Sequence, residues 1–374
     1  MNKTGLFCGS FDPFTYGHLD VVNKAFEKVD TLIINVGDND AKIPQFDKDK
    51  RVEMIIDTLK DHPKCNCITV IAERGMTVDI ALLSDTDVLI RGIRQNSSDM
   101  GQEFTLAAIN KNLALVRGLK LETEFIIQEG ELLRSVSSSA VKFLCEEHEF
   151  ITAFKYVPDN VAEVLAETYL KSLWDECFVN NKAASDLFWQ ELISAYRGRA
   201  YHNLTHIAYM INMLKIYCVY IGDDLKDIRK EVLLAIFIHD IVHDTYAYDA
   251  ENEKSSAKFA KKIREWSVSD IDFDMVINMV MSTSQNANVK VFPIVRDLDL
   301  AILGDFDACK WHKYCRQIRK EYKDFSDEKF NAGRLKFLQT IEKQRIFSTN
   351  FFFNKFEEQA KKNIRTEIAC LQKN

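Results

Sequence analysis

The stretch GSFDPFTYGH, residues 9–18, follows directly on the short apolar run Leu6–Cys8. Gly9 lets the backbone turn tightly, and Gly17 opens an amphipathic stretch whose first free N–H groups can hold a phosphate. His18, in the first turn of that stretch, would face the same anion and could donate a hydrogen bond to it. The segment therefore predicts a strand, a turn and the start of a phosphate-binding helix.

Outward from this segment, short β-rich runs alternate with amphipathic stretches up to about residue 157. The runs that we expect to form strands are Leu6–Cys8, Leu32–Val36, Ile68–Ala72, Val88–Arg91 and Leu121–Ile127. The expected helices span 17–29, 47–61, 76–84, 99–116 and 138–146. Such alternation is typical of an α/β, Rossmann-like fold with a doubly wound parallel sheet, which binds its ligand at the carboxyl ends of its strands.

The strand pattern stops at Val157-Pro158, and the rest of the chain has a nearly continuous helical pattern. A chain of 374 residues is also too long for one ordinary core. We therefore expect two domains, an α/β domain over residues 1–160 and an all-α domain over residues 161–374.

Composition narrows the class of protein. With 47% hydrophobic and 28% charged residues, the chain has the composition of an ordinary globular protein. A net charge of -7 argues against nucleic-acid and membrane-surface partners, which favour basic faces. We expect no apolar run long enough to cross a bilayer and no signal peptide at the start. The nine scattered cysteines indicate reduced thiols and a cytoplasmic location.

Two more blocks of anion-binding residues follow the first. Arg91-Gly92-Ile93-Arg94 ends the fourth expected strand, and Ser137-Ser138-Ser139 opens the last expected helix of the α/β domain. Transfer of a phosphoryl-type group needs mainly positioning and charge neutralisation, for which a histidine, a lysine and arginines suffice.

With these blocks in order, residues 1–160 resemble the phosphopantetheine adenylyltransferase family. The matching residues are Gly9 to His18, Lys42, the Arg-Gly-x-Arg block at 91–94 and the serines at 137–139. The resemblance implies adenylyl transfer from ATP to 4′-phosphopantetheine, giving dephospho-coenzyme A and pyrophosphate, with Mg²⁺ bridging the phosphates of ATP. It also implies assembly as a homo-oligomer.

The resemblance further assigns roles residue by residue. His18 and Ser10 would bind the triphosphate and stabilise the transition state, while Lys42 and Arg91 would hold the acceptor phosphate and Met76 would line the pantetheine pocket. The residues implied to hold ATP are Ser10, Phe11, Gly17, His18, Arg94, Glu103, Ser137, Ser138 and Ser139. The segment Gln95–Gln102 departs from the family pattern by one extra residue, so the position of Glu103 and the choice of acceptor stay open. Nicotinamide mononucleotide is the alternative acceptor.

The helical half carries its own set of ionisable residues. The apolar run 233–242 leads into two His-Asp pairs, His239-Asp240 and His243-Asp244, four residues apart. On one continuous helix the two histidines would share a face. Ionisable groups on so apolar a helix are costly unless something binds them, and imidazole with carboxylate suits Mn²⁺, Fe²⁺ or Zn²⁺. Upstream, Asn203 is the expected N-cap of a helix, with His206 in its first turn and His202 just outside it.

This second pattern resembles the HD superfamily of metal-dependent phosphohydrolases over roughly residues 185–370. The resemblance implies one divalent metal held by His206, His239, Asp240 and Asp299, with Asp297 competing for the last place. Asp244 would be the general base, and the substrate would be an unidentified phosphorylated small molecule. Where relatives commonly have Thr-x-x-His, this chain has Thr283 to Asn286, which favours a mononuclear site. The alternative is a non-catalytic, nucleotide-sensing module.

Overall fold

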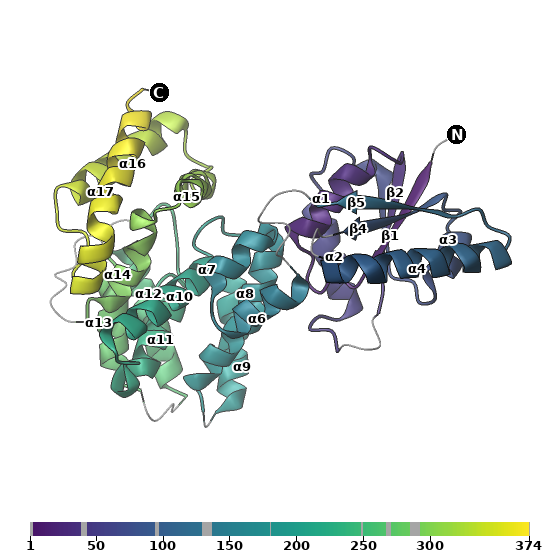
Figure 1. Cartoon of the computed structure of the whole chain (residues 1–374). Helices are drawn as coiled ribbons and strands as arrows, with labels where there is room; N and C mark the ends of the chain where they lie inside the picture. Colours follow the sequence, from purple (N-terminus) through teal and green to yellow (C-terminus); the bar gives the residue numbers. More distant parts are fainter. Residues whose placement is uncertain are drawn as a thin grey trace. The chain divides into compact units, whose positions relative to one another are not determined.

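The computed structural model describes residues 3–38, 43–93, 97–128, 137–179, 181–247, 250–266, 271–284 and 292–373. The chain divides into two compact units, Met1–Leu165 and Ala166–Asn374 (Figure 1). The junction lies inside one helix, α8 (Asp159–Glu176). Each unit is described by itself below.

The first unit is built on a five-stranded sheet in the order β3-β2-β1-β4-β5, and all the pairings are parallel. Its strands are β1 (Thr4–Gly9), β2 (Thr31–Val36), β3 (Ile68–Ile71), β4 (Val88–Ile93) and β5 (Glu122–Ile127). The helices of this unit are α1 (Tyr16–Ala25), α2 (Lys48–Leu59), α3 (Thr77–Leu83), α4 (Ser97–Val116), α6 (Ser138–Glu146) and α7 (Phe150–Ala153), with short 3₁₀ turns at Cys65–Cys67 and Phe154–Tyr156. The parallel α/β sheet predicted from the alternating pattern is confirmed.

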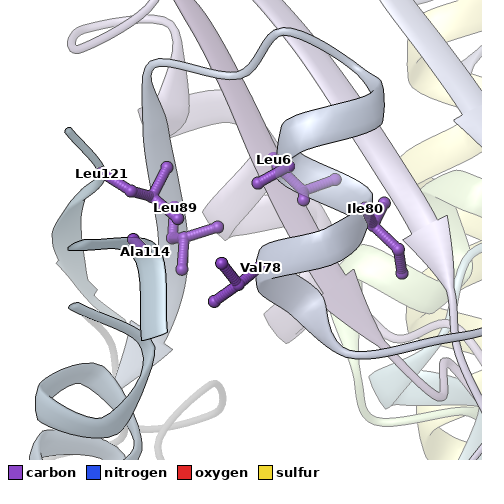
Figure 2. Close-up of a cluster of buried hydrophobic side chains, with 7 residues drawn as sticks. Leu6, Val78, Ile80, Leu89, Ala114 and Leu121 are labelled. Carbon is purple, nitrogen blue, oxygen red and sulfur yellow. The ribbon is translucent and has the colours of Figure 1, made fainter. Parts of the chain in front are cut away.

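The two faces of the sheet are covered by different helices. Leu6 of β1 and Leu89 of β4 pack with Val78 and Ile80 of α3 and with Ala114 of α4, as Figure 2 shows. On the opposite face, a Cβ added to Gly5 would lie 3.1 Å from side-chain atoms of Ile90 and Val29, and one added to Gly92 would lie 2.6 Å from Val21 of α1. These glycines therefore let α1 and the segment after it lie directly on the strands.

The strand order places the predicted phosphate-binding blocks together. β1 and β4 are neighbours, yet the chain leaves β1 toward β2 on one side and leaves β4 toward β5 on the other. A sheet with this reversal has its ligand site where the two departing loops separate. Here those loops begin at Gly9 and at the end of β4, Ile93.

The described part of the second unit is entirely helical, as the sequence predicts. After α8 its helices are α9 (Lys182–Tyr196), α10 (Leu204–Ile221), α11 (Arg229–Ile238), α12 (Glu251–Arg264), α13 (Phe273–Ser282), α14 (Ile294–Leu300), α15 (Ala308–Glu321), α16 (Asp327–Glu342) and α17 (Asn350–Leu371), with 3₁₀ turns at Lys226–Ile228 and Ala301–Gly304. Trp174, Trp189 and Phe237 form an aromatic cluster in its core, with ring centroids 5.3–6.1 Å apart.

Helix α10 differs from the expectation that no apolar run reaches membrane-spanning length. Its 18 residues have a mean hydropathy of 1.3, and by length and composition alone they qualify as a span. Half of that stretch is buried inside the structure. Its His206 and Asn212 are buried polar residues. The helix therefore also has the features of a core helix, in which an apolar composition serves packing.

Helix α11 is shorter than predicted, because it ends at Ile238 and His239 is its C-cap. Residues 239–240 form a turn and 241–242 a bend, and 243–244 have no regular structure, so the helix does not continue. The expectation that His239 and His243 lie on one helix face is therefore wrong. Arg199 gives the physical reason, since its guanidinium donates hydrogen bonds to the carbonyls of Asp240 and Ile241 and holds them away from a helical path.

Candidate functional sites

His18 is held in a defined orientation at the start of α1. Thr15 is the N-cap, and its hydroxyl accepts a hydrogen bond from the His18 backbone N–H. In return, the Thr15 backbone N–H donates to His18 Nδ1 over 3.0 Å. An Nδ1 that accepts leaves the neutral ring with its proton on Nε2. The rings of Phe11 and Phe14, with centroids 5.0 and 5.5 Å from the imidazole, pack against it. His18 is thus set to donate from Nε2.

The loop before α1 is packed tightly enough to explain its glycine. A Cβ on Gly9 would lie 2.8 Å from the Phe11 ring, which is buried at 1% exposure. Phe11 itself has a φ of 47°, in the left-handed region that ordinary side chains rarely adopt. Phe11 therefore packs in the wall of the site, while the neighbouring Ser10 is exposed.

Helix α6 is tied to the same loop by two contacts. The Ser138 hydroxyl donates to the carbonyl of Pro13 over 2.8 Å, and Lys142 Nζ lies 2.6 Å from the Asp12 carboxylate. Ser137 caps the helix by accepting from Ala140 N–H, and Ser139 is exposed. The first and last of the predicted phosphate-binding blocks are therefore adjacent, at two helix N-termini.

The structure describes three of the remaining predicted residues of the first unit, Arg91, Glu103 and Met76. Arg91, at the end of β4, forms an ion pair with Glu103 of α4, with Arg91 Nε and Glu103 Oε2 2.7 Å apart. Two residues assigned to different substrates are thus brought into contact. Met76, the N-cap of α3, is half-exposed. Lys42 and Arg94 lie outside the described residues.

Sequence reasoning missed Arg51, which is only 2% exposed. Its guanidinium donates to the carbonyls of Ser10 and Gly37, which lie in the loops after β1 and β2, and it also pairs with Asp38. Arg51 therefore fixes the loop that carries Ser10. The sequence does place Arg51 on the same buried face of α2 as Met54 and Ile55. An arginine on an apolar helix face could have indicated a buried structural role.

In the second unit, four predicted residues meet at one point. The ligand atoms of His206, His239, Asp240 and Asp299 all lie within 4.8 Å of one another. His206 Nε2 is 3.2 Å from Asp299 Oδ1, and His239 Nε2 is 3.1 Å from Asp240 Oδ2. Asn203 is the N-cap of α10, as predicted, which places His206 in the first turn. These spacings are those of neighbouring ligands around one metal ion.

The environment of this cluster favours a cation. Neither ring nitrogen of His206 has a hydrogen-bond partner among the described residues, although both atoms are buried. His239 Nδ1 lies 2.8 Å from the carbonyl of Ile236, to which it donates, so that Nε2 faces the carboxylates. Burial opposes a charge on His239, but Asp240 and Asp299 outweigh burial and raise its pKa to about 9. Burial likewise opposes ionisation of Asp240, yet the imidazoles of His239 and His202 hold its pKa well below the usual value.

Two other predicted residues, Asp297 and Asp244, are not among the four whose ligand atoms meet. The Asp297 carboxylate is fully buried and accepts hydrogen bonds from the backbone N–H groups of Ser348 and Thr349. Asp297 thus anchors the segment before α17. Of the two aspartates of α14, Asp299 is the one that belongs to the cluster. Asp244 is exposed, and its carboxylate accepts from Tyr246 N–H.

A second group of three residues adjoins the first. His202, His243 and Glu321 also offer ligand atoms within 4.8 Å of one another. Glu321 Oε2 accepts from the backbone N–H groups of Tyr201 and His202, and Oε1 lies 2.5 Å from His202 Nδ1 and 3.0 Å from His243 Nε2. Burial opposes ionisation of Glu321, but the hydrogen bonds from the His202 ring and from the backbone N–H groups keep its pKa well below the usual value. Burial and the neighbouring His243 lower the pKa of His202.

Comparison with known proteins concerns the first unit. The family described as cytidylyltransferase-like matches residues 6–143. A phosphopantetheine adenylyltransferase of Lactococcus lactis is 35% identical over 164 residues, which are 44% of this chain and 94% of the relative. One of Carboxydothermus hydrogenoformans is 37% identical over 140 residues, 37% of this chain and 81% of the relative. One of Phocaeicola vulgatus is 36% identical over 152 residues, 41% of this chain and 94% of the relative.

Among solved structures, a lipopolysaccharide core biosynthesis protein from Thermoplasma volcanium matches 35% of this chain and all of its own, at 19% identity and a TM-score of 0.27. That score is too low to support an argument. The curated relatives, by contrast, are matched over nearly their whole length at more than a third identity, and the family match spans all five strands, from β1 to β5. Through its first unit, the chain belongs to the phosphopantetheine adenylyltransferase family.

Proposed function

We propose that the first unit transfers the adenylyl group of ATP to 4′-phosphopantetheine. An oxygen of the acceptor phosphate attacks the α-phosphorus of ATP, the bond from that phosphorus to the bridging oxygen breaks, and pyrophosphate leaves. The products are dephospho-coenzyme A and pyrophosphate, and no protein nucleophile is required. The observation that best supports the proposal is the orientation of His18 at the start of α1, where the Thr15 N–H donates to Nδ1 and so puts the proton of the neutral ring on Nε2.

The other residues act by position and charge. His18 stabilises the negative charge that grows on the α-phosphate oxygens as the new bond forms. Ser10 binds the triphosphate with His18. The N-terminus of α6 holds ATP together with Arg94 and Glu103; it carries Ser137 to Ser139 and is bonded to the loop before α1. Lys42 and Arg91 hold the acceptor phosphate, and Met76 lines the pantetheine pocket. When bound to the phosphates of ATP, Mg²⁺ would supply positive charge against the leaving pyrophosphate.

An acceptor panel tests this proposal. Full-length protein and ATP are incubated in parallel with 4′-phosphopantetheine, nicotinamide mononucleotide and glycerol phosphate, and pyrophosphate release is measured. We expect release with 4′-phosphopantetheine only, with dephospho-coenzyme A identified by mass spectrometry. Release with nicotinamide mononucleotide alone would keep the adenylyl transfer and change the acceptor.

For the second unit, we propose a metal-dependent phosphohydrolase centre. His206, His239, Asp240 and Asp299 hold one divalent transition metal, either Mn²⁺, Fe²⁺ or Zn²⁺. The buried imidazoles of His206 and His239 support this, because their nitrogens that face the cluster have no hydrogen-bond partner among the residues that the structure describes. Such orphaned groups are costly unless a ligand satisfies them. When bound, the metal would activate water for attack on a phosphoester.

The substrate is a phosphorylated small molecule, and Asp244 is the proposed general base. A screen of full-length protein, loaded with each metal, against phosphomonoesters, phosphodiesters and nucleotides tests for hydrolysis. A protein that binds metal or nucleotide, hydrolyses nothing, and still alters transferase kinetics would indicate a sensing module instead.

A further inference from the structure

The three residues of the second group come from separate segments that only the fold brings together. His202 precedes α10, His243 lies in the loop after α11, and Glu321 is the last residue of α15. Their side chains are 17%, 10% and 6% exposed. The group is therefore largely shielded from water, where unpaired polar atoms are expensive.

Glu321 is held ready before any ligand arrives. Backbone N–H groups of Tyr201 and His202 occupy its Oε2, which fixes the carboxylate and leaves Oε1 facing the two imidazoles. His243 Nε2 is buried, 3.0 Å from Oε1, and has no hydrogen-bond partner in the part of the chain that the structure describes. With metal–ligand bonds of about 2.0–2.2 Å, adjacent ligands lie roughly 3.0–3.5 Å apart, so this separation fits a shared cation.

His202 connects the group to the first cluster. Its Nδ1 donates to Glu321, which directs Nε2 toward Asp240, 3.8 Å from Oδ2. The same oxygen of Asp240 is 3.1 Å from His239 Nε2. Asp240 therefore lies between the imidazoles of the two groups, at the place that a bridging carboxylate occupies in two-metal sites.

We propose that His202, His243 and Glu321 hold a second divalent cation, with Asp240 shared between it and the first. Two imidazole nitrogens and a carboxylate oxygen select the same transition metals as the first cluster. The histidine that the segment from Thr283 to Asn286 lacks is thus supplied from elsewhere in the fold. Two cations about 3.5–4 Å apart bind both the attacking and the leaving oxygen of a displacement at phosphorus, which points to phosphate mono- or diesters as substrates.

The inference rests on the proposed metal centre. The number of metal ions bound per chain distinguishes a failure of the second site from a failure of the first. Full-length protein is stripped, loaded with Mn²⁺, desalted and assayed for bound metal. We expect two equivalents for the wild type and one for His243→Ala. In the control His312→Ala, which changes an exposed histidine of α15, two should remain. Electron paramagnetic resonance should show a spin-coupled manganese pair in the wild type and an uncoupled ion in His243→Ala.

One equivalent in the wild type that His243→Ala leaves unchanged would overturn the second site and leave the first standing. No bound metal at all would overturn both. Circular dichroism checks that each variant is folded. If His243→Ala unfolds, Glu321→Gln replaces it, because the amide oxygen still accepts from the backbone while the charge is lost, and the same drop to one equivalent is expected.

Discussion

The ammonium of Lys142 lies 2.6 Å from the carboxylate of Asp12, so that α6 is joined to the loop after β1. Asp12 is only 5% exposed, and its oxygens also accept from the backbone N–H groups of Gln45 and Phe46. One carboxylate thus connects three segments around the proposed ATP site.

Replacing this carboxylate should destabilise the first unit. Asp12→Ala leaves the buried N–H of Phe46, the partly buried N–H of Gln45 and one largely buried ammonium without this partner, and we expect a loss of about 2–3 kcal/mol of unfolding free energy. Urea unfolding followed by circular dichroism measures it. The control is Glu53→Ala, which removes an exposed ion pair with Lys50 and should cost under about 1 kcal/mol. Equal losses in the two variants would show that Asp12 has no special role.

His18→Ala should remove most of the transferase activity. Loss of a preorganised donor to the growing charge lowers kcat by roughly 10²–10³-fold, with KM for ATP changed much less. His239→Ala, in the other unit, should leave the transfer rate unchanged. Steady-state pyrophosphate release by both variants tests this, and a His18→Ala variant with normal kcat would exclude the proposed role.

The ion pair between Arg91 and Glu103 makes a prediction about substrate binding. Glu103 pairs with Arg91 in the free protein, so under the proposed assignment it competes with the acceptor phosphate for that guanidinium. Glu103→Gln should therefore lower KM for the acceptor while raising KM for ATP several-fold, because ATP loses a charged hydrogen-bond acceptor. Glu122→Gln, at an exposed position of β5, is the matched control. A rise in both KM values would instead indicate that Glu103 orients Arg91 for binding.

Metal should stabilise the second unit through the first cluster. Mn²⁺ at about 100 times its Kd adds roughly 2.7 kcal/mol to the unfolding free energy of a protein that binds it only when folded. We expect a higher Tm for the helical unit of the wild type, and a smaller increase in a His206→Ala/His239→Ala double variant, which keeps only the second proposed site. Differential scanning calorimetry with and without Mn²⁺ measures the shift. Equal shifts in both proteins would place the bound metal elsewhere.

Thiol reactivity should depend on burial. Burial raises the pKa of Cys8 to about 11, although Arg91 opposes the shift. Three units below that value, at pH 8, only about one thiol in a thousand is ionised, and the thiolate is the reactive form. Cys8 should thus resist iodoacetamide at pH 8 and react as the pH approaches 11, whereas the exposed Cys309 and Cys370 react at pH 8. Peptide mass spectrometry reads each site, and rapid alkylation of Cys8 at pH 8 would contradict the packing around β1.

The local sequence predicted the elements of the first unit more completely than those of the second. The alternation of apolar runs predicted all five strands, and the predicted helix 138–146 coincides with α6 because Ser137 is a strong N-cap. The end of α11 was not predictable. No glycine or proline lies between Ile238 and Pro293. The helix is stopped by Arg199, 41 residues before Asp240 in the chain, through its hydrogen bond to the Asp240 carbonyl.

The group formed by His202, His243 and Glu321 could not be predicted from local sequence either. Glu321 is separated from His202 by 119 positions, and no local pattern marks it as their partner. Likewise, Asp297 and Asp299 are equivalent in the sequence, and only the backbone N–H groups at Ser348 and Thr349 distinguish them. The spacing in the sequence predicted that histidines and aspartates would form a cluster. Which of the aspartates belongs to the cluster is decided by tertiary contacts.

Helix α8 belongs to both units, which constrains any gene that encodes one of them alone. Val161 and Leu165, both fully buried, belong to the first unit, where Asn160 bonds to Thr58. Trp174, on the same helix, belongs to the aromatic core of the second unit. A stop codon after residue 160 would therefore strip apolar side chains from the transferase, and a start codon after residue 176 would strip them from the helical half. A gene for either half alone has to encode the whole helix, so two independent halves require it twice.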